Sequence, residues 1–118
     1  YYQAFRVILP SAGLYRFASA STLDTFGYLY GDTFFPESPR VNLYGADDDS
    51  GGNRQFKFTM SLDMNMTYIL VVTTFHANTT GHISVLVSGL GRVSVLPVNG
   101  TLTTTPSTTT TTSMLNQY

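Results

Sequence analysis

The chain has 118 residues, 42% of them hydrophobic and 11% charged, with a net charge of −1, a length that suits one domain with a single core. Its six basic residues stand singly, without the clustering that a nucleic-acid or anionic-membrane surface requires, and no apolar run reaches the roughly 18 residues of a membrane span. It has no cysteine, which excludes disulfides, thiolate metal sites and thiol nucleophiles.

Runs of β-branched and aromatic residues recur along the first hundred positions, separated by Gly, Pro, Asn and Asp at intervals of about ten residues. No window shows a sustained 3.6-residue apolar stripe, which argues against helices. We therefore predict an all-β fold, an antiparallel β-sandwich or jelly-roll-like barrel of about eight short strands with a Thr-rich C-terminal tail. In chain order, the predicted strands are 4–9, 14–19, 25–30, 41–45, 54–62, 67–75, 82–88 and 92–98.

Two of these runs carry more specific patterns. Residues 67–75 (TYILVVTTF) are apolar on both faces, which predicts a central strand that is buried on both sides. Residues 54–62 (RQFKFTMSL) alternate, which predicts a half-buried strand with Gln55 on the outer face. Its inward residues are expected to be Phe56, Phe58, Met60 and Leu62.

After Gly100 the composition changes to TLTTTPSTTTTTSMLNQY, which divides the chain into a domain, 1–100, and a tail, 101–118. Thr-rich sequence with Pro is typical of O-glycosylated stalks and has too few apolar groups for its own core. A disordered linker is the alternative that this composition leaves open. The expected O-glycosylation sites are Thr103, Thr104, Thr105, Thr108, Thr109, Thr110, Thr111 and Thr112.

The last part of the tail carries three large side chains: Met114, Leu115 and Tyr118. If the tail paired with a sheet edge, the pairing would satisfy its backbone hydrogen bonds and bury these side chains. We therefore expect the tail to dock on a neighbouring subunit or on a sheet edge of its own domain.

Three Asn-x-Thr sequons, at Asn65, Asn78 and Asn99, fall at predicted strand ends or loops, where a glycan is tolerated. Together with the Thr-rich tail, they predict a secreted, extracellular glycoprotein.

The stretch GADDDSGGN, residues 45–53, places Asp47, Asp48 and Asp49 side by side in a chain with little other charge. Either water solvates these carboxylates on a turn, or they hold a cation such as Ca²⁺, which prefers six to eight oxygen ligands. An EF-hand does not fit, because position 51 is Gly and position 58 is Phe, so a calcium site would need ligands from separate strands.

Four elements follow one another in an order typical of one protein family: LPSAGLY (9–15), LD (23–24), DDSGG (48–52) and YILVV (68–72). In this order the chain, from about residue 3 to 89, resembles the bacterial pre-peptidase C-terminal domain, a small β-sandwich of secreted proteins. The resemblance implies a calcium site formed by Asp24 with Asp47, Asp48 and Asp49. The chain departs from the family pattern at MTY (66–68), where Gly-Thr-Tyr is usual, and at an insertion, 32–40.

No enzymatic activity is expected. His76 and His82 flank a predicted turn without a Cys or an HExxH frame, and no GxSxG elbow is present. The spacing of the acidic residues selects no catalytic pair.

Two non-catalytic functions compete. The first is a glycosylated structural subunit that self-associates, as a homo-oligomer or filament, into an extracellular fibre or surface array through its terminal segments. The second is a secreted binding module for polysaccharide or matrix protein, in which Tyr28, Tyr30 and Tyr44 form a platform on one sheet face. Tyrosines at such spacing also occur as cross-strand packing pairs, so both interpretations stay open.

Overall fold

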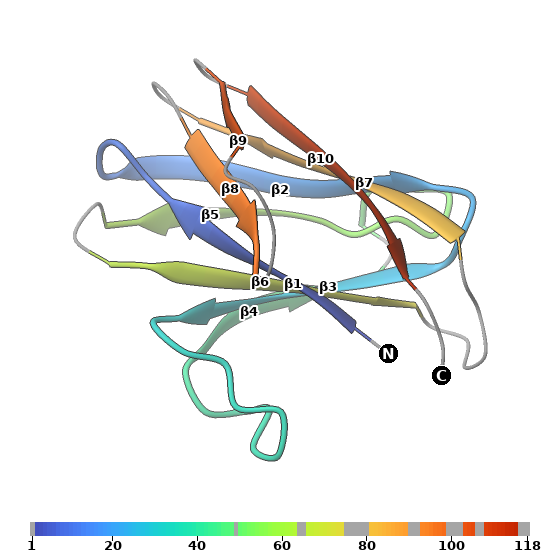
Figure 1. The fold of residues 1–118 in the computed structure, drawn as a ribbon, viewed down its shortest axis with the longest axis horizontal. Helices are drawn as coiled ribbons and strands as arrows, with labels where there is room; N and C mark the ends of the chain where they lie inside the picture. Colours follow the sequence, from blue (N-terminus) through green and yellow to red (C-terminus); the bar gives the residue numbers. More distant parts are fainter. Residues whose placement is uncertain are drawn as a thin grey trace.

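The computed structural model of the chain describes residues 2–48, 50–63, 66–74, 81–89, 93–98, 103–105 and 108–115. These residues form ten strands in two sheets, and no helix occurs among them. In this described part, accordingly, no helix is long and apolar enough to cross a membrane. All pairings within the two sheets are antiparallel, and the sheets pack face to face as the two layers of a β-sandwich (Figure 1).

The larger sheet has six strands. Its spatial order is β4 (Leu43–Asp47), β3 (Thr25–Gly31), β6 (Tyr68–Thr74), β1 (Tyr2–Ile8), β8 (Val93–Pro97) and β9 (Thr103–Thr105). The smaller sheet has four strands. Its order is β10 (Thr108–Leu115), β7 (Gly81–Ser88), β2 (Gly13–Ser21) and β5 (Lys57–Leu62).

The predicted all-β, antiparallel fold is confirmed. The eight strands β1 to β8 coincide with the eight predicted runs to within three residues at each end, and β9 and β10 come from the Thr-rich tail. The division between a domain, 1–100, and a tail, 101–118, stays a prediction.

One continuous apolar core fills the space between the sheets. Alternate residues of each strand enter it, as Tyr15 and Phe17 do from β2, because successive side chains of a strand point to opposite faces. The two sheets contribute similar numbers of large side chains. Those from the six-stranded sheet are Phe5, Val7, Leu29, Tyr68, Leu70, Val72, Val93 and Val95, and those from the other strands and loops are Leu9, Tyr15, Phe17, Phe56, Leu62, Ile83, Val85 and Val87.

Strand β6 is buried on both faces, as its sequence predicts. Its inner residues join the main core, whereas Ile69 and Val71 join a second, smaller cluster with Tyr30 on the outer face of the six-stranded sheet. Ala4, Tyr28 and Phe34 pack against that cluster. The outer face of this sheet is therefore partly covered by its own side chains.

The prediction that Gln55 faces outward is wrong. Asn53 and Arg54 both have positive φ, 54° and 65°, so the strand begins only at Lys57 and the alternation does not extend back to Gln55. Gln55 is 7% exposed. Its amide is paired on both sides: Oε1 accepts from the Ser19 hydroxyl at 2.9 Å and Nε2 donates to the Leu23 carbonyl at 2.8 Å.

A glycine in β3 permits close contact between the sheets. The Phe56 ring packs against the backbone of Gly27, where an added Cβ would lie 2.7 Å from Cδ1 of that ring. Gly45 on β4 offers a comparison, because its added Cβ would lie 2.8 Å from Sδ of Met60, which is near the far end of a flexible side chain.

We predict that Gly27→Ala lowers the free energy of unfolding by about 1–3 kcal/mol, because the buried Phe56 ring has no room to move. Gly45→Ala should cost less, because Met60 can change rotamer. Urea unfolding monitored by tyrosine fluorescence measures both variants. Equal stability of the Gly27→Ala variant and the natural chain would contradict the packing described here.

Candidate functional site

The outer face of the six-stranded sheet carries a row of aromatic rings. Phe26 stacks on Tyr28 with ring centroids 4.6 Å apart, Tyr28 lies 6.4 Å from Tyr30, and Tyr30 lies 4.7 Å from Phe34. Phe26, Tyr28 and Tyr30 are alternate residues of β3, so their side chains lie on one face of the sheet. Phe34 belongs to the loop that follows β3. The row thus runs along β3 and continues into the β3–β4 loop, residues 32–42.

Hydrogen bonds fix the β3–β4 loop against the sheet. The Tyr30 hydroxyl donates to the Pro39 carbonyl at 2.8 Å, and the Gly31 N–H donates to the Asn42 carbonyl at 2.9 Å. The Asn42 side chain donates to the Thr33 carbonyl at 3.0 Å, which closes the loop from within. Residues 32–40, the segment predicted to be an insertion, thus belong to a loop that is tied to β3 and extends beyond β4 in Figure 1.

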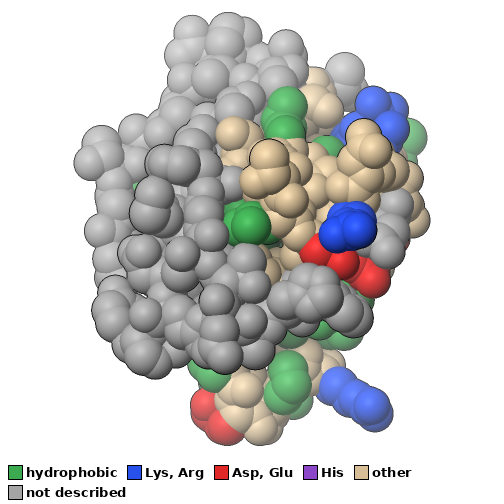
Figure 2. Space-filling model, turned by 90° about the vertical axis from the view of Figure 1, so that its right-hand side faces the viewer, with side chains coloured by type: hydrophobic (Ala, Val, Ile, Leu, Met, Phe, Trp, Pro, Cys, Tyr) green, Lys and Arg blue, Asp and Glu red, His purple; other side chains and the backbone are tan. Residues whose placement is uncertain are grey.

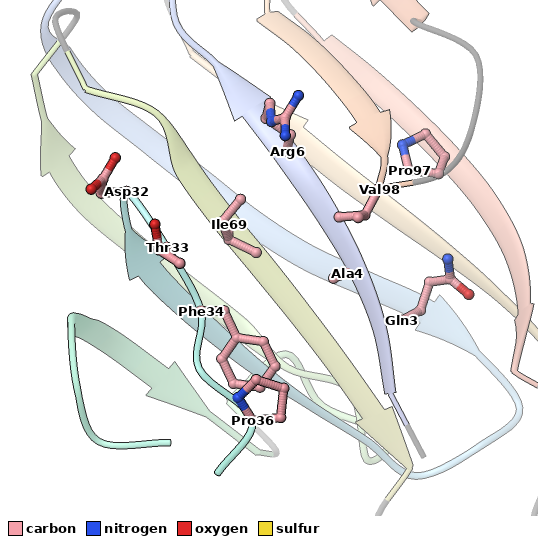
Figure 3. Close-up of a pocket in the computed structure, with 10 residues that line it drawn as sticks. All are labelled: Gln3, Ala4, Arg6, Asp32, Thr33, Phe34, Pro36, Ile69, Pro97 and Val98. Carbon is pink, nitrogen blue, oxygen red and sulfur yellow. The ribbon is translucent and has the colours of Figure 1, made fainter. Parts of the chain in front are cut away.

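A groove of about 590 Å³ lies between this loop and strand β1. Figure 3 shows Gln3 and Arg6 on β1, Ile69 on β6, and Asp32 and Thr33 where the loop begins. The remaining lining residues are Ala4, Phe34, Pro36, Pro97 and Val98. The groove therefore combines an apolar floor with polar side chains of both charges.

A second groove, of about 410 Å³, lies on the other side of Phe34. Its lining is mainly aromatic and aliphatic, with Arg40 and Thr73 as the polar side chains. The other lining residues are Tyr28, Tyr30, Phe34, Pro39, Leu43 and Val71. Phe34 lines both grooves and separates them.

Of the three tyrosines expected on one platform, the structure brings only two together. Tyr28 and Tyr30 line the second groove, whereas Tyr44 lies edge-on to the core residue Tyr68 at 5.5 Å. The register of β3 and β4 shifts between Leu29 and Tyr30, and this irregularity breaks the alternation. Burial raises the pKa of both Tyr28 and Tyr30. The negative charge of Asp48 raises the pKa of Tyr28 further, and Tyr28 raises that of Tyr30. Both hydroxyls are therefore protonated at neutral pH.

Exposed apolar side chains concentrate on the six-stranded sheet. Of the seven large hydrophobic residues that are exposed in the described part of the chain, three lie on its strands (Ile8, Leu43 and Tyr44), one directly follows β8 (Val98), and two belong to the β3–β4 loop (Phe35 and Val41). On the face drawn in Figure 2, the described surface is mostly polar and uncharged, with a few basic and acidic side chains among small hydrophobic patches.

The alternation of polar and apolar residues in the sequence indicated neither groove, because the β3–β4 loop that forms them has no periodic pattern.

The acidic turn is organised around Asp47. Its carboxylate accepts hydrogen bonds from the Ser50 hydroxyl at 2.6 Å, the Ser50 N–H at 3.0 Å and the Lys57 N–H at 2.8 Å. Burial alone would raise the pKa of Asp47, but these bonds outweigh it and hold the pKa below its usual value. Asp47 thus closes the turn between β4 and β5.

The other candidate metal ligands are placed only in part. Asp24 lies just before β3, and its Oδ1 atom is buried without a hydrogen bond from the described residues. Asp48 follows β4, and Asp49 lies outside the described residues. Among the residues that are described, no three acidic, His or Cys side chains are grouped as a metal site would require. The calcium site therefore stays a prediction.

The Thr-rich tail supplies the outer strand of each sheet on the same side of the sandwich. β9 pairs with β8, and β10 pairs with β7 over eight positions, from Thr108 opposite Ser88 to Leu115 opposite Gly81. All eight predicted O-glycosylation positions lie on these two strands. Met114 and Leu115 end β10, and Tyr118 lies outside the described residues.

The three sequon asparagines, Asn65, Asn78 and Asn99, all lie outside the described residues. In the sequence they fall between β5 and β6, between β6 and β7, and between β8 and β9. His76 also lies outside, and His82 is the second residue of β7.

The fold and these features define an antiparallel β-sandwich with a grooved outer face and edge strands from a Thr-rich tail. No family model, curated protein or solved structure matches the chain. The resemblance to the pre-peptidase C-terminal domain accordingly stays a prediction.

We predict that Asp47→Asn lowers the free energy of unfolding by about 1 kcal/mol at neutral pH, because it weakens charge-assisted bonds to Ser50 and Lys57. When the pKa of a carboxyl group is lower in the folded state than in the unfolded state, its ionised form stabilises the fold at pH values above the unfolded-state pKa. This stabilisation is lost as the pH falls through the folded-state pKa. The difference between variant and natural chain should therefore shrink below pH 3.8, the ordinary pKa of the group.

Urea unfolding in calcium-free buffer across the acidic range measures this difference. Asp63→Asn is the matched control, because it makes the same charge change at an exposed residue after β5. A constant difference at every pH would contradict the role given to the ionised carboxylate.

Proposed function

We propose that this protein is a non-catalytic, extracellular structural module that assembles with further copies of itself through its Thr-rich tail. The observation that supports this proposal is the position of β10. An eight-residue strand that is rich in β-branched Thr forms the edge of the four-stranded sheet, and β7 is its one partner in that sheet among the described residues. The pairing depends on backbone hydrogen bonds that any copy of the same strand can make.

Exchange of β10 between copies would preserve the backbone pairing of β10 with β7. If the β10 strand of one copy paired with β7 of another, each sheet would keep its four strands while the two copies became linked. Repetition of this exchange along a row of copies would give a filament. The register of the exchanged strand is fixed by the pairs already seen, such as Thr112 opposite Ser84.

The absence of native cysteine allows a direct test. We predict that chains with Ser84→Cys and chains with Thr112→Cys, mixed during refolding and then oxidised, form disulfide-linked pairs, because cross-strand partners lie within disulfide distance. Non-reducing electrophoresis measures the linked pairs, and electron microscopy of native material shows whether filaments form. Position 84 alternates with the buried Ile83 and Val85, so the substitution avoids the core.

Two controls make the result decisive. Thr112→Cys mixed with Ser88→Cys is out of register by four residues and should link much less. A single chain with both Ser84→Cys and Thr112→Cys reports the competing outcome: if it forms only an internal disulfide and the mixed single variants stay unlinked, the assembly proposal is wrong.

Secretion and glycosylation belong to the same proposal. Their support is the sequence, namely the three sequons and the Thr residues of β9 and β10. An intact mass of native material well above the 12.9 kDa of the bare chain would support glycans, and the bare mass would contradict them.

Calcium binding by Asp24 with Asp47, Asp48 and Asp49 is a further part of this proposal. Its support in the structure is the buried Oδ1 atom of Asp24, an oxygen that a cation would stabilise. Against it, Asp47 already accepts three hydrogen bonds from the turn.

We predict that Ca²⁺ at about a hundredfold excess over its Kd raises the free energy of unfolding by about 2.7 kcal/mol, and that a chelator reverses the gain. Calorimetry with Ca²⁺ and with EDTA measures this change. Asp24→Asn should abolish the response while Asp63→Asn keeps it. A melting temperature that EDTA leaves unchanged would remove calcium from the proposal.

A further inference from the structure

We propose that the groove between β1 and the β3–β4 loop binds a neutral sugar residue of a glycan. This inference goes beyond the assembly proposal and does not depend on it, because the groove and the tail strand β10 involve different residues. It gives a ligand class to a groove whose lining includes one of the exposed apolar side chains, Val98.

The strand register places opposite charges on two sides of the groove. Arg6 on β1 is opposite Ile69 on β6, and Ile69 is in turn opposite Tyr30 on β3. Two strand spacings therefore separate the β1 and β3 backbones, about 10 Å. Asp32 directly follows β3 and lines the groove on the opposite side of Ile69 from Arg6 (Figure 3).

This charge arrangement favours a polar ligand without net charge. An anion that approached Arg6 would also meet the Asp32 carboxylate, and a cation at Asp32 would meet the Arg6 guanidinium, so the groove has no net preference for either charge. A wholly apolar ligand would remove both charged groups from water without replacing their hydrogen bonds. A ligand with many hydroxyls satisfies both, because each hydroxyl donates and accepts.

The remaining lining matches the apolar face of a sugar ring. Ala4 and Ile69 form the floor, and Ile69 is 8% exposed, so a ligand there rests on a packed surface. Phe34 and Pro36 stand at one end (Figure 3), and Gln3 adds an amide that both donates and accepts. The volume of about 590 Å³ falls in the usual range for small-ligand sites.

The backbone at Asp32 is held in an uncommon conformation. Its φ is 67°, in the left-handed region, and its N–H donates to the Thr67 carbonyl at 2.6 Å. Such conformations persist only where surrounding contacts impose them, and they occur often at binding sites. Here the constraint presents the Asp32 carboxylate at the rim of the groove.

Phe34 extends the site toward the second groove, whose lining includes Tyr28 and Tyr30. A glycan of more than one residue would cross Phe34, with one sugar in each groove, because the two grooves share this ring. The net charge of the chain is only −1, so electrostatic attraction favours an ionic partner little.

The test uses the full chain and three neutral disaccharides, maltose, cellobiose and lactose, with two charged probes: glycine, a zwitterion that could contact Arg6 and Asp32 together, and acetate, an anion. Amide chemical shifts in ¹H–¹⁵N NMR spectra report where each probe binds. At least one disaccharide should shift the signals of Ala4, Thr33 and Ile69 in a saturable way, and neither charged probe should do so. Absence of any disaccharide response up to the solubility limit, or a response to glycine or acetate alone, would overturn the proposal.

Two variants test the named side chains. Arg6→Gln and Asp32→Asn should each weaken the sugar roughly tenfold, the usual effect of losing one charge-assisted hydrogen bond. Asn also tolerates the left-handed backbone, so Asp32→Asn keeps the loop intact. Arg16→Gln and Asp63→Asn make the same chemical changes elsewhere and should leave affinity unchanged. Unaltered binding by both groove variants would contradict the proposed site.

Discussion

Strand β6 is shielded from water on both faces, and much of the remaining structure depends on how this is achieved. On the inner face, Leu70 and Val72 are covered by the opposite sheet, as in any sandwich. On the outer face no third layer is present in the described part of the chain, so Ile69 and Val71 are covered by Tyr30 and its neighbours. The β3–β4 loop has to lie close to the sheet for this purpose, and its incomplete cover leaves the grooves on either side of Phe34.

A second constraint joins the two sheets through buried polar groups. The Ser19 hydroxyl on β2 lies 2.6 Å from that of Thr25 on β3, and it also accepts from the Phe56 N–H at 3.1 Å. Gln55 completes the network from the turn that precedes β5. Each buried polar atom here would be costly if left unpaired, so the network fixes the alignment of the layers more narrowly than apolar packing alone.

The sequence predicted the strands well because alternation and turn residues are local signals. Strand β6 and the inward residues of β5 are examples, since each pattern lies within a few consecutive positions. The inward turn of Gln55 was not predictable, because it follows from two successive positive-φ residues and from a partner 36 positions away, Ser19. The departure of Tyr44 from the expected platform has a similar cause, a register shift between neighbouring strands that no local pattern reveals. The first groove has Arg6 and Asp32 on opposite sides only because of the strand order β1, β6, β3, which periodicity does not encode.

The tail supplies an outer strand to each sheet on one side of the sandwich, β9 to the larger and β10 to the smaller. During synthesis, therefore, the strands β1 to β8 emerge first with the β7 and β8 edges both unfinished, and residues 103–115 complete them last. Until the tail is synthesised, the unpaired backbone groups of β7 and β8 can accept hydrogen bonds from, and donate them to, any compatible strand. The short connection from β8 to β9 gives a chain's own tail a high effective concentration at these edges, so another copy can supply the strand only where it is present before the tail emerges.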